Sequence, residues 1–143
     1  MTLFIKKVTA AQELEQCYAI RKKVFVDGQK VPLHEELDGK DLESCHYLLI
    51  KDEQPVGVAR VRVLKDYAKI ERVAILDAYQ GQGLGQQIMQ YILNDLKINP
   101  SIISAKLSAQ CQVIRFYEKL GFIVCSNEYW DAGIVHQDMY LNF

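Results

Sequence analysis

Apolar and polar residues alternate in several short runs of the chain, a pattern that predicts β-strands. We expect strands over residues 2–8, 46–51, 56–64, 70–76, 102–108, 122–129 and 135–141. In the run 70–76, apolar residues after Glu71 occupy both sets of alternating positions, which is typical of a central strand covered on both faces. Turn-forming residues at 52–55 predict that the runs on either side form an antiparallel hairpin.

Other segments carry apolar residues at helical spacing. The first follows a predicted capping box with Thr9 as N-cap and Gln12 at N3, and its apolar stripe passes through Arg21, which should therefore face inward. Two more helices are expected over residues 85–97 and 111–120, the latter closed by Gly121. Residues 28–43 are polar and acidic, and predict a loop or short helical turn.

The resulting order, β-α-β-β-β-α-β-α-β-β, predicts the fold class α/β (α+β), with a mixed central sheet flanked by helices. The chain has 143 residues, half of them apolar, and lacks repeats and linker-like stretches. We therefore expect a single domain over residues 1–143.

Charge and composition limit the kinds of partner that the protein is expected to bind. Seventeen Lys and Arg oppose 18 Asp and Glu without a basic block, so we expect no nucleic-acid partner. No apolar run approaches a signal peptide or membrane span, which favours a cytoplasmic protein without a membrane partner.

The cysteines and histidines lack the spacing of zinc ligands, so we expect no metal. Cys17, Cys45, Cys111 and Cys125 are interpreted as reduced, buried apolar residues. A nucleophilic Cys111 is the alternative, but the residues on either side of it are glutamines and supply no base.

The sequence Gln-Gly-Gln-Gly-Leu-Gly at residues 80–85 lies between a predicted buried strand and an amphipathic helix. Glycines at a helix N-terminus let an anion approach free backbone N–H groups, so the segment predicts a phosphate cradle. The dinucleotide-binding fingerprint needs glycine at position 86, and the P-loop needs lysine followed by serine or threonine after its glycines. Gln86 and Gln87 match neither motif. The alternative is a turn that serves chain geometry alone.

Two motifs carry a family resemblance. Gln80-x-x-Gly83-x-Gly85 resembles the Q/R-x-x-G-x-G/A signature of the GNAT N-acetyltransferases, whose loop binds the pyrophosphate of acetyl-CoA. Residues 116–122 (Phe-Tyr-Glu-Lys-Leu-Gly-Phe) are similar to a second family segment, and Gln110 falls where many members carry Asn. The stretches around Arg21, residues 29–32, 36–41, His46 and residues 132–136 are similar to the ElaA/YjcF-like branch.

The resemblance implies a GNAT-like sheet that is mixed and mostly antiparallel, and a site for acetyl-CoA as cosubstrate. Backbone N–H groups of Val73, Ala74 and Ile75 would hold the pantetheine and acetyl carbonyl, and Tyr117 would protonate the departing thiolate. The implied cofactor-binding set is Val73, Ala74, Ile75, Gln80, Gly81, Gln82, Gly83, Leu84, Gly85, Gln110 and Tyr117.

Two groups are candidates for the general base. Glu71 stands where the family often places a carboxylate, although Arg60, Arg62 or Arg72 could simply pair with it, and His136 is the second candidate.

The acidic segment is the candidate acceptor site. We expect Glu36, Asp38 and Asp41 to bind a cationic acceptor, with Arg21 beneath them as organiser. If the segment is instead an ordinary solvated loop, the acceptor is expected beside His136.

The implied activity is N-acetyl transfer from acetyl-CoA directly to a primary amine, without an acyl-enzyme. A non-catalytic acyl-CoA-binding module, an enzyme similar to acyl-homoserine-lactone synthases, and a partner-binding protein without a ligand are the alternatives. The acceptor could be a small molecule, a peptide or a protein N-terminus. The oligomeric state, a homodimer included, stays open.

Overall fold

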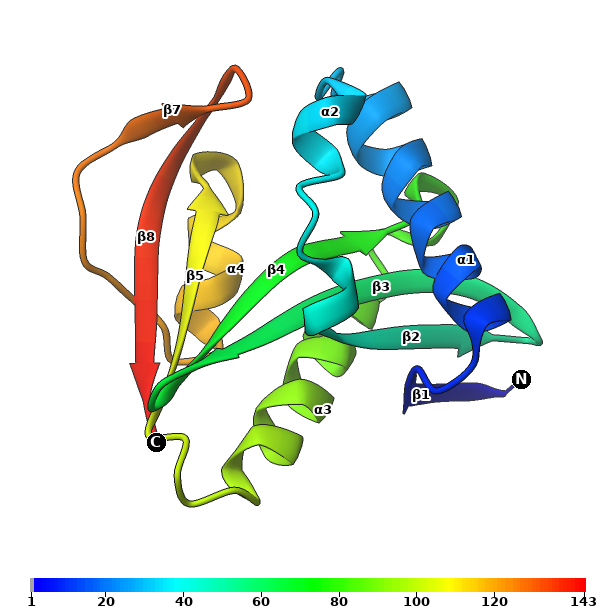
Figure 1. Ribbon diagram of the computed structural model, residues 1–143. Helices are drawn as coiled ribbons and strands as arrows, with labels where there is room; N and C mark the ends of the chain where they lie inside the picture. Colours follow the sequence, from blue (N-terminus) through cyan, green and yellow to red (C-terminus); the bar gives the residue numbers. More distant parts are fainter. Residues whose placement is uncertain (1) are drawn as a thin grey trace.

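A computed structural model describes residues 2–143 and places eight strands in one sheet (Figure 1). The strands are β1 (Leu3–Lys7), β2 (Cys45–Lys51), β3 (Gln54–Leu64), β4 (Tyr67–Ile75), β5 (Ser104–Gln110), β6 (Ile123–Val124), β7 (Tyr129–Asp131) and β8 (Ile134–Asn142). Their order is β1-β2-β3-β4-β5-β8-β6, with β7 also paired to β8. Only β4 and β5 pair in parallel within residues 2–143, so the predicted mixed, mostly antiparallel sheet is confirmed.

Helices flank both faces of this sheet (Figure 1). The α-helices are α1 (Ala11–Arg21), α2 (Leu33–Glu36), α3 (Leu84–Lys97) and α4 (Ile114–Lys119). A π-helical turn η1 (Lys22–Gly28) continues α1, and short 3-10 turns are η2 (Asp41–Glu43), η3 (Asp77–Tyr79) and η4 (Cys111–Val113).

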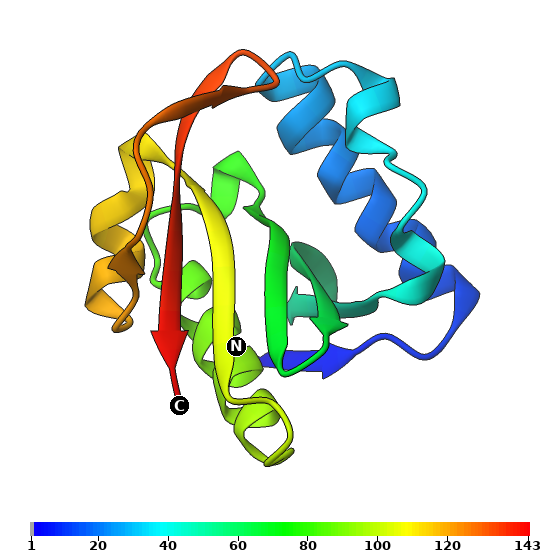
Figure 2. The same cartoon turned by 60° about the vertical axis from the view of Figure 1, so that its left-hand side comes forward.

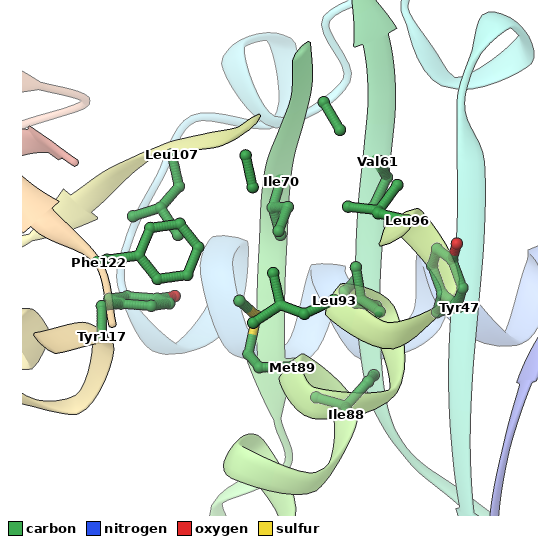
Figure 3. Close-up of a cluster of buried hydrophobic side chains, with 14 of the residues drawn as sticks. Tyr47, Val61, Ile70, Ile88, Met89, Leu93, Leu96, Leu107, Tyr117 and Phe122 are labelled. Carbon is green, nitrogen blue, oxygen red and sulfur yellow. The ribbon is translucent and has the colours of Figure 1, made fainter. Parts of the chain in front are cut away.

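The main core lies between α3 and the sheet. Figure 3 shows Ile88, Met89 and Leu93 of α3 beneath Ile70 of β4, all of them buried. A second cluster packs α1 against the opposite face, through Cys17 and Ile20 of the helix and Leu48, Val58 and Ala74 of the strands. The central strands are therefore covered on both faces, as the apolar run 70–76 predicted.

The strands β4 and β5 separate along their length. Their pairing covers only Tyr67–Lys69 with Ser104–Lys106, and beyond Lys69 the two strands diverge (Figures 1 and 2). The register of β3 and β4 also shifts between Val58 and Arg60, a β-bulge that bends the strand. The backbone of residues 70–75 therefore has no β5 partner, although it lies in the middle of the sheet.

Two local predictions were wrong. The N-cap of α1 is Ala10 rather than Thr9, because the Glu13 carboxylate accepts the backbone N–H groups of both Thr9 (3.1 Å) and Ala10 (3.2 Å), where Gln12 was expected. The strand expected over 122–129 shortens to β6. Ser126 Oγ accepts the N–H of Asp138 at 2.8 Å, so a side chain replaces the next ladder bond.

The cysteines differ from the expectation of buried filler. All four are free thiols, as predicted, but only Cys17 is buried. Cys45 and Cys125 are exposed, and Cys111 is half-buried.

Candidate active site

A cavity of about 600 Å³ occupies the gap between β4 and β5. Its walls come from η1 and α2 on one side and from β5, α4 and β8 on the other, and residues 79–85 close one end. Nine of the eleven predicted cofactor-binding residues line it, namely Val73, Ala74, Ile75, Gln80, Gly81, Leu84, Gly85, Gln110 and Tyr117. Gln82 and Gly83 lie in the same loop but outside the lining, and Gln82 bonds to Lys51.

The glycine-rich loop is open on its outer side. Gly81 and Gly83 have φ of +78° and +77°, which side-chain-bearing residues rarely adopt, and a Cβ at either would meet no atom within 4 Å. Gln80 fixes the start of the loop by donating from Nε2 to the Ile75 carbonyl at 3.1 Å. Because Gly83 is the N-cap of α3, free N–H groups of the first helical turn lie beside this open surface.

Tyr117 of α4 is buried against the aromatic rings of Phe116 and Phe122, with centroids 4.9 and 6.0 Å away (Figure 3). Burial raises the pKa of Tyr117 to about 12. The residue lines the cavity and stays a neutral phenol at physiological pH.

His136 of β8 lines the opposite part of the cavity, directly across the ladder from Gln110. Its Nδ1 lies 2.7 Å from the Ile134 carbonyl, which can only accept, so we assign the proton to Nδ1. In the neutral ring the lone pair is then on Nε2, which makes no hydrogen bond to residues 2–143. His136 is 9% exposed, so this nitrogen belongs to a largely buried side chain.

Glu71, the other predicted base, is held in ion pairs. Its carboxylate accepts hydrogen bonds from Arg60 Nε at 2.9 Å and from Arg62 Nη2 at 2.7 Å. Burial raises the pKa of Glu71, but the hydrogen bonds from Arg62 and Arg60 outweigh it, and the net shift is downward. A carboxylate stabilised in this way is a weak proton acceptor.

The predicted acceptor residues form a charge-balanced cluster. Four guanidinium groups meet four carboxylates in it, those of Arg21, Arg60, Arg62 and Arg72 with those of Glu36, Asp38, Asp41 and Glu71. Arg21 faces inward as predicted: it is 0% exposed and contacts Glu36 at 2.8 Å and Asp41 at 2.7 Å.

The same contacts change the interpretation of the acidic segment. Glu36 lines the cavity at only 3% exposure, whereas Asp38 and Asp41 do not line it. A hydrogen bond from Arg60 lowers the pKa of Asp38, so its negative charge is already matched within the protein. These carboxylates hold the cavity wall together instead of presenting free charge to an acceptor.

From the sequence, Arg72 was considered only as a partner for Glu71. In the structure it contacts α2 instead. It has φ of +56° within β4, and its Nε lies 2.6 Å from Glu36 Oε2. Its Nη2 donates to the carbonyl oxygens of Glu35 (3.3 Å) and Glu36 (3.1 Å). Arg72 therefore ties α2 to the strand just before the residues expected to hold the acetyl group.

Gln29 entered the sequence analysis only as part of the stretch 29–32 that carries the family resemblance, and its contact in the cavity was not predicted. Its side-chain amide exchanges hydrogen bonds with that of Gln110, at 2.8 and 3.4 Å, across 81 residues of chain. Both residues line the cavity, so the pair joins its two walls.

Comparison with known proteins agrees with this geometry. Residues 8–143 match the family description "Acetyltransferase (GNAT) domain". The chain belongs to the GNAT family. It is 36% identical to the N-acetyltransferase YjcF of Bacillus subtilis over 129 residues, covering 90% of this chain and 91% of YjcF. It is 32% identical to the protein ElaA of Escherichia coli, covering 88% and 87% of the two chains.

Solved structures share the fold. The crystal structure of E. coli ElaA has a TM-score of 0.88 with 98% of this chain and 99% of its own covered, at 26% identity. A GNAT acetyltransferase from Elizabethkingia anophelis, solved with acetyl-CoA bound, has a TM-score of 0.75 at 18% identity, covering 99% of this chain and 98% of its own.

This GNAT chain is thus an acyltransferase of the ElaA/YjcF-like branch. None of the helices within residues 2–143 is long and apolar enough to cross a membrane.

Removing Arg21 tests how much the charge cluster stabilises the fold. We expect Arg21→Met to lower the free energy of unfolding by about 3–5 kcal/mol, because Glu36 and Asp41 would stay buried with one cation fewer. The control Lys22→Met removes an exposed cation next to it and should change the value by less than about 0.5 kcal/mol. Urea unfolding measures both, and equal effects would contradict the role assigned to Arg21.

Proposed function

We propose that this GNAT protein transfers the acetyl group of acetyl-CoA directly to a primary amine. The observation that carries the proposal is the cavity itself, which runs from an open glycine loop at a helix N-terminus to the edge of β4 that has no β5 partner. The first feature suits a pyrophosphate and the second suits a thioester carbonyl, because both supply N–H donors without a side chain in the way.

In the proposed reaction the amine lone pair attacks the thioester carbonyl carbon. His136 Nε2 accepts the proton that the amine nitrogen loses, and N–H groups of residues 73–75 stabilise the oxyanion. The C–S bond then breaks and the thiolate leaves with its electron pair. Tyr117 or water returns a proton to sulfur. The pKa of Tyr117, about 12, is higher than that of a thiol, so proton transfer from its hydroxyl to the thiolate is uphill. The contribution of Tyr117 to the rate is therefore modest.

We assign the base to His136 in preference to Glu71. His136 lines the cavity and has a ring nitrogen with no hydrogen bond to residues 2–143, which supports this choice, while Glu71 is neutralised by two arginines. In this proposal Glu71 is a positioning residue that fixes Arg60 and Arg62 against β4. No side chain need form an acyl-enzyme, since Cys111 does not line the cavity.

Gly83→Glu tests the cofactor site. A glutamate would add a side chain and a negative charge where the pyrophosphate is expected, so acetyl-CoA should no longer raise the melting temperature. Gly39→Glu is the matched control, because Gly39 also has φ of +78° and open space around it but lies away from the loop. If a folded Gly83→Glu variant keeps its affinity for acetyl-CoA, the proposed cofactor site is wrong.

His136→Gln tests the base. The variant should lower kcat by about 100-fold or more and remove the limb of the pH–rate profile that reports the base. Acetyl-CoA affinity, measured by calorimetry, should stay within about twofold because the histidine acts on the amine. If instead Glu71→Gln removes the limb and His136→Gln keeps it, the assignment is reversed.

Tyr117→Phe tests the proton donor. We expect kcat to fall by about tenfold, or about 1.4 kcal/mol in the barrier, with unchanged acetyl-CoA affinity. Steady-state kinetics of CoA release measure this effect. An unchanged kcat would make Tyr117 a packing residue.

A further inference from the structure

A second cavity opens directly beside the candidate active site. It has a volume of about 480 Å³ and shares Lys69 and Leu107 with the first cavity. Lys106, Tyr67 and Asp138 also line it. The two hollows are therefore neighbours along the same stretch of β4 and β5.

Two lysines meet at this junction. Lys69 and Lys106 are direct partners in the β4–β5 ladder, at the last pair before the strands separate. Side chains paired in this way share one face of the sheet, so two ammonium groups repel each other there. Such a pair is stabilised when an anion binds between its members.

Neither lysine has a strong partner inside the protein. Lys106 is exposed and lies over the Tyr67 ring at 4.2 Å, and no carboxylate of residues 2–143 forms an ion pair with it. Lys69 reaches Glu71 only at 3.7 Å, and that carboxylate is already held by two arginines. The carboxylate in the second cavity, Asp138, accepts a hydrogen bond from the Tyr129 hydroxyl at 2.5 Å. Two cations thus face one carboxylate.

The opposite end of the first cavity carries the reverse charge. Glu35 of α2 and Asp131 of β7 both line it and both are exposed, and neither forms an ion pair within the described chain. Between them and the lysines lies His136, largely buried and with an unpaired Nε2. Figure 1 shows α2 and the β7–β8 turn at the same end of the molecule, with β4 and β5 meeting toward the other.

From this polarity we infer that the acceptor is a short peptide-like amine with an anionic group at its far end. Its ammonium group would be attracted between Glu35 and Asp131 and would release one proton to solvent to become the free amine. That amine would lose its second proton to His136 on attack, and the carboxylate would lie between Lys69 and Lys106. This inference rests on the proposed acetyl transfer and adds the class of acceptor.

The sheet sets the length of this acceptor. Gln110 is the ladder partner of His136, and Lys106 lies four residues before it on β5, a separation of about 13 Å at 3.3 Å per residue. An extended tetrapeptide spans about the same distance, so its terminal carboxylate can reach the lysines while its amine is beside His136.

Tetraalanine and tetraalanine amide are the probes, with CoA release from saturating acetyl-CoA as the readout. For the wild-type protein we expect kcat/KM to be at least about tenfold higher for the acid than for the amide, an advantage that high salt reduces. Lys106→Gln should bring the acid to within twofold of the amide and leave the amide unchanged. Lys97→Gln, which removes an exposed lysine of α3, should keep the full preference. With dialanine the preference should vanish, because its carboxylate is too close to the amine.

Equal kcat/KM for the two tetrapeptides, or a preference that survives Lys106→Gln, would overturn the inference. So would the absence of any reaction with tetraalanine while calorimetry shows acetyl-CoA bound. If the wild-type protein does not bind acetyl-CoA at all, the proposed function fails first, and calorimetry distinguishes that case from a wrong acceptor.

Discussion

The separation of β4 from β5 is the constraint on which the site depends. A strand in the middle of a sheet normally pairs on both edges, because unpaired backbone N–H and C=O groups are costly to bury. Here β4 pairs with β3 from Tyr67 to Ile75, apart from the bulge at residues 72 and 73, but pairs with β5 over three residues only. The unpaired edge can be satisfied only by solvent or by a bound molecule, and both walls of the cavity follow from the divergence.

The wall on the N-terminal side is made rigid by buried charge. Arg21 and Arg60 are both 0% exposed, a placement that is tolerated only because carboxylates surround each guanidinium group. Ion pairs of this kind add little net stability compared with apolar packing, but they fix geometry because each group needs its particular partner. The short helix α2 has few contacts of its own and is held in place mainly by Arg21 and Arg72.

Local patterns predicted the elements that local forces decide. The strands, α3 and the glycine loop were recognisable because their apolar period, turn residues and glycines act over a few neighbours, and Arg21 was placed inward by its helical stripe. The cap of α1 was misplaced by one residue because the Glu13 carboxylate, which also pairs with Lys6, accepts the N–H groups of both Thr9 and Ala10. Pairs such as Arg60 with Asp38 or Gln29 with Gln110 depend on the tertiary fold, so the spacing of residues in the sequence does not predict them. For this reason Asp38 and Asp41 were expected to pair with Arg21 and also to bind an acceptor, and their contacts with Arg60 were not foreseen.

Arg72 shows how a single position can meet two opposed structural demands. Its left-handed backbone is best tolerated by glycine or asparagine, while its side chain must deliver a guanidinium group to α2. Glycine would keep the backbone and lose these contacts. Lysine would keep a charge but lose the fork in which Nε contacts the Glu36 carboxylate while Nη2 donates to the backbone carbonyls of α2. No single substitution satisfies both demands, so any replacement at residue 72 loses contacts that hold α2.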